Sequence, residues 1–268
     1  MSSNIRSISI IRRFSNGDAH PQTDMVAIEE PLELRVEGKP TAVLMRTPGE
    51  DLNLCRGFLY TEGVIEDRDD IHAIAHIDSP SRPKGNTVDV RLSSGVPLLR
   101  REKAKRSFFA SSSCGICGKE SIERVITSGT KIPFTPTFDE SILFSLPQKL
   151  LSKQQSFSKT GGIHAVGLFD TAGNLLYLEE DIGRHNALDK VIGKALEQDA
   201  LPLSNHILLF SGRASFELLQ KAWTAKVPIV VAIGAPSSLA VDLAQKAGIM
   251  LYAFLRENRC NQYTMGIV

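Results

Sequence analysis

Ile207-Leu208-Leu209-Phe210-Ser211-Gly212-Arg213-Ala214-Ser215 opens the stretch of sequence, residues 207–254, that decides the fold. The apolar run at residues 207–210 predicts a buried strand, and residues 227–232 and 249–254 predict two more. Between them, residues 215–226 and 237–247 carry apolar side chains at helical spacing. Strand, helix, strand, helix, strand is the order of a parallel sheet with right-handed crossovers. The fold class is therefore α/β.

The chain before this stretch divides into two regions. Residues 1–98 read mainly as strands, with a short helix opened by Pro48-Gly49-Glu50. Residues 142–151 form a helical stripe divided by Pro147, and a hairpin and a helix follow it. We therefore predict a β-rich N-terminal part over residues 1–137, which carries a Cys-x-x-Cys loop, and an α/β domain over residues 138–268.

Composition indicates an ordinary soluble globular protein, with 42% hydrophobic and 23% charged residues. The formal net charge of +1 over 268 residues gives no global field that would draw the chain to nucleic acid or membrane. No apolar run nears the ~20 residues of a membrane span. Residues 1–13 carry arginines where a signal peptide needs an apolar core. We expect a cytoplasmic protein without nucleic-acid or membrane partners.

One local cluster departs from this balance. Residues 100–106, Arg-Arg-Glu-Lys-Ala-Lys-Arg, contain five cations in seven residues. They form either a solvated strand edge or loop, or a landing patch for a phosphorylated ligand or an acidic partner.

Ligands of a parallel sheet collect at the carboxyl ends of its strands. Three such ends lie at residues 211–215, 234–238 and 255–259. The first two precede helices and offer hydroxyls and free N–H groups, which are features of an anion site. Arg213, Arg256 and Arg259 can add bidentate contacts to phosphate. The alternative is that Ser211 and Ser237 only cap helices and that the arginines are solvated.

A second polar segment is residues 179–190, Glu-Glu-Asp-Ile-Gly-Arg-His-Asn-Ala-Leu-Asp-Lys. The structural interpretation is that Asp181 caps a helix and the others are surface charges. The functional interpretation is that His185 lines a pocket together with His164, which follows the flexible turn Thr160-Gly161-Gly162.

The four cysteines are too few for a disulfide scaffold. Cys55 reads as a buried thiol of the short helix. Cys114 and Cys117 are open to three interpretations. They lack the two further ligands of a structural zinc site, and a Ser-rich loop precedes them where a thioredoxin-like pair needs a strand. A loop thiolate that accepts and donates sulfur fits better, since nearby Lys119 favours the ionised form.

Several motifs together resemble one protein family, although no single motif would suffice. The motifs are Ser113-Cys114-Gly115-Ile116-Cys117-Gly118-Lys119, Thr160-Gly161-Gly162-Ile163-His164-Ala165, the segment 180–190, Ser211-Gly212-Arg213-Ala214-Ser215 and Ala235-Pro236-Ser237-Ser238-Leu239-Ala240. From about residue 30 to its end, the chain is similar to the formate dehydrogenase accessory sulfurtransferase family, FdhD/NarQ.

The resemblance implies a function. Family members take persulfide sulfur from a cysteine desulfurase and deliver it to the molybdenum (or tungsten) bis(molybdopterin guanine dinucleotide) cofactor before its insertion into formate dehydrogenase. Cys114 would then carry the persulfide and Cys117 would assist. The family's cofactor-binding stretch corresponds to residues 254–259, that is Phe254, Leu255, Arg256, Glu257, Asn258 and Arg259. With Ser211, Gly212, Arg213, Ser237 and His185 from the analysis above, these are the expected cofactor-binding residues.

The resemblance also implies a homodimer and a fold like that of cytidine deaminase, a three-layer domain with a smaller β-rich N-terminal part. The chain lacks the H-x-E and P-C-x-x-C elements of zinc deaminases, so we expect no structural metal and no deaminase activity. Cys260 departs from the family's pattern. Its thiol either packs against the rest of the protein or traps sulfur. The competing functions are a non-catalytic molybdenum cofactor-binding chaperone and a small zinc-binding module.

Overall fold

The computed structural model describes residues 4–78, 83, 85–105 and 130–267, and its strands form three sheets. The six-stranded sheet has the order β12-β11-β10-β9-β7-β8. Its strands are β7 His164–Asp170, β8 Leu175–Asp181, β9 His206–Phe210, β10 Ile229–Ala232, β11 Met250–Ala253 and β12 Asn261–Met265. The four-stranded sheet β4-β3-β6-β5 and the ribbon β1-β2 comprise β1 Ile5–Arg13, β2 Ala19–Ala27, β3 Glu30–Val36, β4 Lys39–Arg46, β5 Ile71–His76 and β6 Thr87–Leu92.

The parallel core predicted from residues 207–254 is confirmed. β10 pairs in parallel with β9 on one side and β11 on the other. All four residues of β10 are fully buried, because helices cover both faces of the sheet, and this explains its unbroken apolar run. β7 and β12 run antiparallel to their neighbours. The sequence analysis did not predict β12, whose Asn-Gln-Tyr-Thr-Met sequence lies mostly exposed at the sheet's edge.

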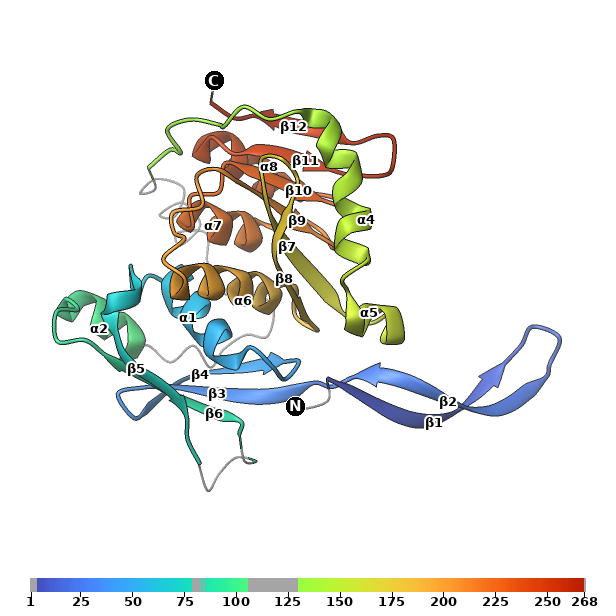
Figure 1. Cartoon of the computed structure of the whole chain (residues 1–268). Helices are drawn as coiled ribbons and strands as arrows, with labels where there is room; N and C mark the ends of the chain where they lie inside the picture. Colours follow the sequence, from blue (N-terminus) through green and yellow to red (C-terminus); the bar gives the residue numbers. More distant parts are fainter. Residues whose placement is uncertain (1–3, 79–82, 84, 106–129, 268) are drawn as a thin grey trace.

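Helices form a layer on each face of the six-stranded sheet (Figure 1). One layer holds α6 Arg184–Glu197, α7 Phe216–Thr224 and α8 Ser238–Ala247. The other holds the 3-10 helix η2 Glu140–Ser145, α4 Leu146–Leu151 and α5 Gln155–Thr160. Each layer closes its own core against the sheet. Pro147 lies in the first turn of α4, where its missing N–H costs nothing, so the predicted division of the 142–151 stripe is confirmed.

A third core lies between the four-stranded sheet and α1 Asp51–Thr61. The strands and the short helix predicted for residues 1–98 are present there, and Cys55 is a fully buried thiol. The 3-10 helix η1 Arg68–Asp70 precedes β5. The β1-β2 ribbon extends away from the rest of the molecule (Figure 1). The structure is thus a mixed α/β protein with several sheets, and its likeness to cytidine deaminase remains a prediction.

The basic cluster at residues 100–106 is not a strand edge or a loop over its described part. Residues 98–105 form α2, Leu98–Lys105. Two of its arginines bind the protein itself, since Arg100 lies 2.6 Å from an Asp70 carboxylate oxygen and Arg101 donates to the Val96 carbonyl at 3.0 Å. Asp70 lies 30 residues before Arg100 in the sequence, so charge density alone did not reveal this pair.

The two helices α1 and α6 cross so closely that only glycine fits at the crossing. A methyl group on Gly57 would overlap the backbone carbonyl of Asp189, and one on Gly193 would overlap that of Asn53. Glycines at both sides let the two backbones touch. This crossing joins the helix over the four-stranded sheet to a helix of the six-stranded sheet.

Buried ion pairs reinforce the junction. Lys190 of α6 lies 2.8 Å from Asp181, and both side chains are almost completely buried. The ammonium of Lys190 also donates to the Thr47 carbonyl at 3.0 Å, while Asp181 accepts from the Thr47 N–H at 3.2 Å. Lys221 binds Asp189 in the same way at 2.9 Å. Residues of segment 179–190 therefore connect the end of β4 to the six-stranded sheet.

The domain boundary at residue 137 remains a prediction. Residues just before it contact the C-terminal half, since Ile132 donates to the Ala247 carbonyl and is fully buried in the core beneath α6, α7 and α8.

We predict that Gly57→Ala lowers the free energy of unfolding by about 3 kcal/mol, because the new methyl group meets backbone that cannot yield. This loss would occur despite alanine's higher helix propensity, worth about 1 kcal/mol. Urea denaturation of Gly57→Ala and of the control Gly95→Ala, whose added methyl group meets only open space, measures the difference. Equal stability of the two variants would contradict the close crossing.

We predict that Lys190→Met lowers the free energy of unfolding by about 3–5 kcal/mol, because it leaves Asp181 buried without its counter-charge. Lys194→Met is the control, since the Lys194 side chain is 30% exposed and pairs with Glu179 at 3.3 Å. We expect a clearly smaller loss there. A Lys190→Met protein as stable as Lys194→Met would show that the buried pair does not hold the junction.

Candidate functional site

The loops after the three parallel strands are hydrogen-bonded into one unit. The Gly234 N–H donates to the Gly212 carbonyl at 2.9 Å, and the Phe254 N–H donates to the Gly234 carbonyl at 3.1 Å. The Ser237 N–H donates to the Ala214 carbonyl at 3.0 Å. The predicted gathering of these loops at one edge of the sheet is therefore confirmed, and the bonds extend the sheet beyond its last residues.

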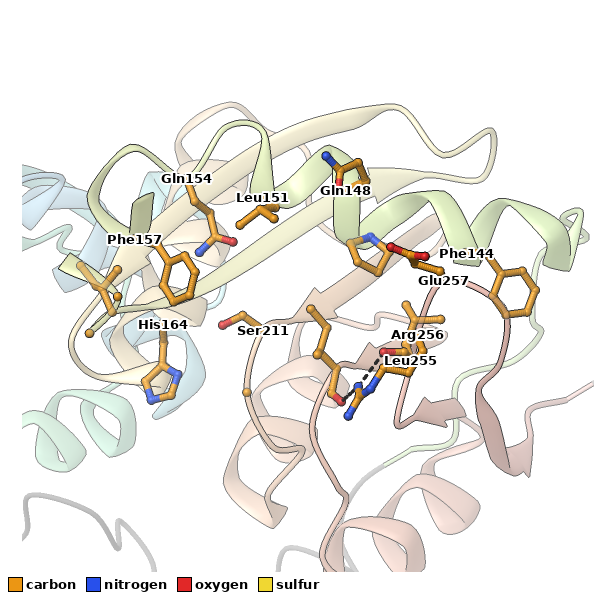
Figure 2. Close-up of a pocket in the computed structure, with 16 residues that line it drawn as sticks. Phe144, Gln148, Leu151, Gln154, Phe157, His164, Ser211, Leu255, Arg256 and Glu257 are labelled. Atoms are coloured by element: carbon orange, nitrogen blue, oxygen red, sulfur yellow. Dashed lines mark hydrogen bonds between the residues drawn. The ribbon is translucent and has the colours of Figure 1, made fainter. Parts of the chain in front are cut away.

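A cavity of about 700 Å³ lies over this edge. It has the size of a site for a nucleotide or a similar small molecule. Figure 2 shows Phe144, Leu151 and Phe157 of the η2–α4–α5 segment on one side, facing Ser211 and Leu255 of the strand ends. One wall comes from the helical layer on one face of the sheet and the other from the loops at the strand ends, so the cavity lies between the two.

The α5 wall is fixed by an acidic residue of the polar segment. Both carboxylate oxygens of Glu180 accept backbone N–H groups at the start of α5, from Ser156 and Phe157, each at 2.8 Å. These bonds satisfy donors that the helix cannot satisfy itself. Glu180 thereby holds Phe157 at the cavity.

Five of the predicted cofactor-binding residues line the cavity, namely Ser211, Gly212, Leu255, Arg256 and Glu257. The other six do not, namely Phe254, Asn258, Arg259, Arg213, Ser237 and His185. Ser237 instead caps α8, where its hydroxyl accepts the Ala240 N–H at 3.2 Å. Arg256 donates to the carbonyls of Ile233 and Leu255, both at 2.8 Å, so its guanidinium is partly engaged by the loops themselves (Figure 2).

The sequence analysis missed the opposite wall. Phe144, Pro147, Gln148, Leu151, Gln154 and Phe157 all line the cavity. The apolar stripe at residues 142–151 predicted a helix but not a cavity wall, and Leu151 of that stripe is 46% exposed in the structure. The turn Gly161-Gly162 and His164 also line the cavity, as the functional interpretation of that turn expected, but without His185.

His185 lies on the other side of the sheet, in the first turn of α6. Its side chain is 23% exposed, and its Nε2 is 4.0 Å from a Glu217 carboxylate oxygen. Burial, and then the nearby cations Arg184 and Lys221, lower the pKa of His185 to about 4. Burial also lowers the pKa of His164. Both imidazoles are therefore neutral at physiological pH.

The predicted sulfur carriers Cys114 and Cys117 lie outside the described residues. The two described cysteines lack the features of a reactive thiol. Burial raises the pKa of Cys55 far above its usual range, and burial followed by Glu140 raises that of Cys260. Cys260 is half-buried against the core under α4, in keeping with the packing alternative. Among the described residues, no His, Cys, Asp and Glu side chains gather into a metal-binding group, and no helix is long and apolar enough to cross a membrane.

The fold and the cavity define an α/β protein with a small-molecule site at the carboxyl ends of its parallel strands. Residues 27–266 match the model of the FdhD/NarQ family. The chain belongs to this family.

Two relatives agree with this assignment, and a solved structure shares the fold. "Sulfur carrier protein FdhD" of Mycolicibacterium paratuberculosis is 45% identical over 262 residues, 95% of each chain. The protein of that name from Saccharolobus solfataricus is 38% identical over 257 residues, 94% of this chain and 93% of the other. A crystal structure described as a candidate formate dehydrogenase accessory protein from Desulfotalea psychrophila has a TM-score of 0.73 over 98% of both chains. At 21% identity, this structure supports the fold alone.

The lowered pKa of His185 predicts a pH-dependent stability. Its pKa in the folded state, about 4, is below the ~6.5 of an unfolded chain, so the unfolded state binds protons first on acidification. The contribution is full above pH ~6.5 and is lost as the pH falls towards about 4. His185→Gln should flatten the fall in unfolding free energy across this window, as measured by urea denaturation at several pH values. An unchanged slope would contradict the buried neutral imidazole.

Proposed function

We propose that this protein is a sulfur carrier in the maturation of formate dehydrogenase. The observation that carries the proposal is the 45% identity to a named sulfur carrier protein over 95% of both chains. The strand-end cavity supports it, because a carrier that modifies a cofactor needs a site to hold that cofactor as substrate.

In its finer form, the proposal is that a cytoplasmic cysteine desulfurase hands sulfur to Cys114. The Cys114 thiolate attacks the outer sulfur of the donor's persulfide, a new S–S bond forms, and the donor leaves as a thiolate. Cys117 then attacks the inner sulfur of the Cys114 persulfide. This releases hydrosulfide for the metal and leaves a Cys114–Cys117 disulfide, which a cellular dithiol reduces for the next cycle.

The substrate in this proposal is the molybdenum bis(molybdopterin guanine dinucleotide) cofactor. The cavity residues suit a guanine nucleotide, since Phe144 and Phe157 provide aromatic faces and Glu257 can accept N–H groups of the base. The Gly212 backbone allows close approach of a phosphate. Two guanine nucleotides per cofactor also suit a homodimer in which each subunit holds one. The finished cofactor then passes to formate dehydrogenase.

The alternative is a non-catalytic chaperone that binds the cofactor without carrying sulfur. The observation in its favour is that the described cavity is lined without any cysteine. The two functions differ in whether Cys114 and Cys117 carry sulfur, so an experiment on these thiols distinguishes them.

We predict that Cys114→Ala abolishes formate dehydrogenase activation in cells while the protein stays folded. Cys260→Ala is the control and should leave activation intact, because the Cys260 thiol is half-buried with a raised pKa. After incubation with a desulfurase and cysteine, mass spectrometry should find one added sulfur atom on the wild-type protein and on Cys260→Ala, but none on Cys114→Ala. Full activation by Cys114→Ala, together with no added sulfur on Cys114 or Cys117 of the wild-type protein, would establish the chaperone instead.

A further inference from the structure

A group of basic side chains gathers behind the cavity, where α6 and α7 begin. Arg184 and His185 lie in the first turn of α6, and His164 lies at the start of β7. On β7, Ala165 belongs to the core under α4 and Val166 to the core under α6 and α7. Because strand side chains alternate, His164 lies on the α6–α7 face. Arg213 follows β9 beside it.

Three buried polar atoms in this group have no hydrogen-bond partner among the described residues. They are the Arg184 Nε, the His185 Nε2 and the Ser215 Oγ. An unpaired buried polar atom costs about 1–3 kcal/mol. A ligand oxygen at these two adjoining helix starts can accept from the Arg184 Nε and the Ser215 hydroxyl, and from the His185 Nε2 when that nitrogen carries a proton.

Within the part of the chain that the structure describes, the starts of these two helices also have no side-chain cap. Ser215 occupies the N-cap of α7 but makes no capping hydrogen bond with its side chain, and Gly183 at the N-cap of α6 has no side chain to do so. Ser237 at the start of α8 shows the usual arrangement, with its hydroxyl bonded to the third residue of the helix. α6 and α7 thus keep free N–H groups and the positive ends of their dipoles at the same place.

We propose that the cluster of His164, Arg184, His185, Arg213 and Ser215 binds a compact oxyanion and takes up protons as it does so. The ligand class is a tetrahedral dianion with several acceptor oxygens, such as a phosphate group. Guanidinium groups, a hydroxyl and helix N-termini are the groups that proteins use for such anions. The site is separate from the apolar cavity wall, and it stands whether or not the protein carries sulfur.

The proton uptake follows from the charges around the imidazoles. His185 faces Arg184 on its own helix, Lys221 and Glu217 from α7, and His164 from β7. His164 faces Arg184, Asp181 from β8 and Arg213. The cations and burial keep both rings neutral when the site is empty of anion. A bound dianion would offset the cations and raise both pKa values, so the anion binds more tightly as the pH falls.

His164 and Gly212 connect this site to the cavity. Both line the cavity, and a methyl group on Gly212 would lie 3.2 Å from the His164 Nδ1. The anion can therefore be a free ion, or it can be the phosphate part of a nucleotide whose base lies in the cavity. The chemistry of recognition is the same in both cases.

The test measures sulfate binding, because sulfate keeps both charges over the whole pH range used. Histidine side-chain NMR of the full chain should show the pKa values of His164 and His185 rising on sulfate addition. Sulfate affinity by calorimetry should be at least about threefold tighter at pH 5.5 than at pH 7.5. His185→Gln should lose most of this pH dependence, and Arg184→Gln should weaken binding about tenfold.

His206→Gln is the matched control. His206 also has a pKa lowered by burial, but it lies at the opposite end of β9. It should bind sulfate as the wild type does, with the same pH dependence. Unchanged histidine pKa values on sulfate addition, or wild-type affinity in Arg184→Gln, would overturn the proposal.

Two further ligands identify the source of the anion. If GDP displaces sulfate and guanosine does not, the cluster binds nucleotide phosphate. If neither displaces it, the cluster serves a free anion. Sulfur loading of Cys114 is measured separately, so failure of the oxyanion site and failure of the sulfur-carrier function are distinguishable.

Discussion

The close crossing of α1 and α6 is the constraint on which the rest of the structure depends. Gly57 and Gly193 allow the two helix backbones to touch, and the buried pair Asp181–Lys190 binds the end of β4 from the other half of the chain. α6 consequently has one side in the core of the six-stranded sheet and another against α1. Its first turn is held in place by both, and that turn carries Arg184 and His185.

Much of the fold could be predicted from the sequence because its signals were local. The unbroken apolar runs of β9 and β10 and the helical spacing between them reflect burial on both faces of the sheet. Pro147 divides the 142–151 stripe because it fits the first turn of α4 but not the interior of a longer helix. β12 and α2 were not predicted. β12 is a mostly exposed edge strand, and Arg100 of α2 pairs with Asp70, which lies 30 residues earlier in the chain.

Only one wall of the candidate site, the loops at the strand ends, could be predicted from the sequence. Strand order places residues 211–215 and 255–259 at one edge, so their proximity followed from topology. The wall from α4 and α5 depends on how that segment packs back over the sheet, which no local pattern records. Segment 179–190 was the most misleading. Its density of charged groups suggested a catalytic or binding role. In the structure, four of these groups form hydrogen bonds or ion pairs within the protein, namely Glu180, Asp181, Asp189 and Lys190.

The part of segment 179–190 that is still available to bind a ligand is the first turn of α6, with Arg184 and His185. Asp181 is neutralised by Lys190 and binds the Gly183 N–H at 2.8 Å, so its charge does not cancel the guanidiniums nearby. The structural pair thus leaves the first turn of α6 positive. His164 lines the cavity, and the charge of Arg184 in that turn acts on its ring. A ligand that fills the cavity and one that binds the helix starts must therefore either be the same molecule or sense each other through this histidine.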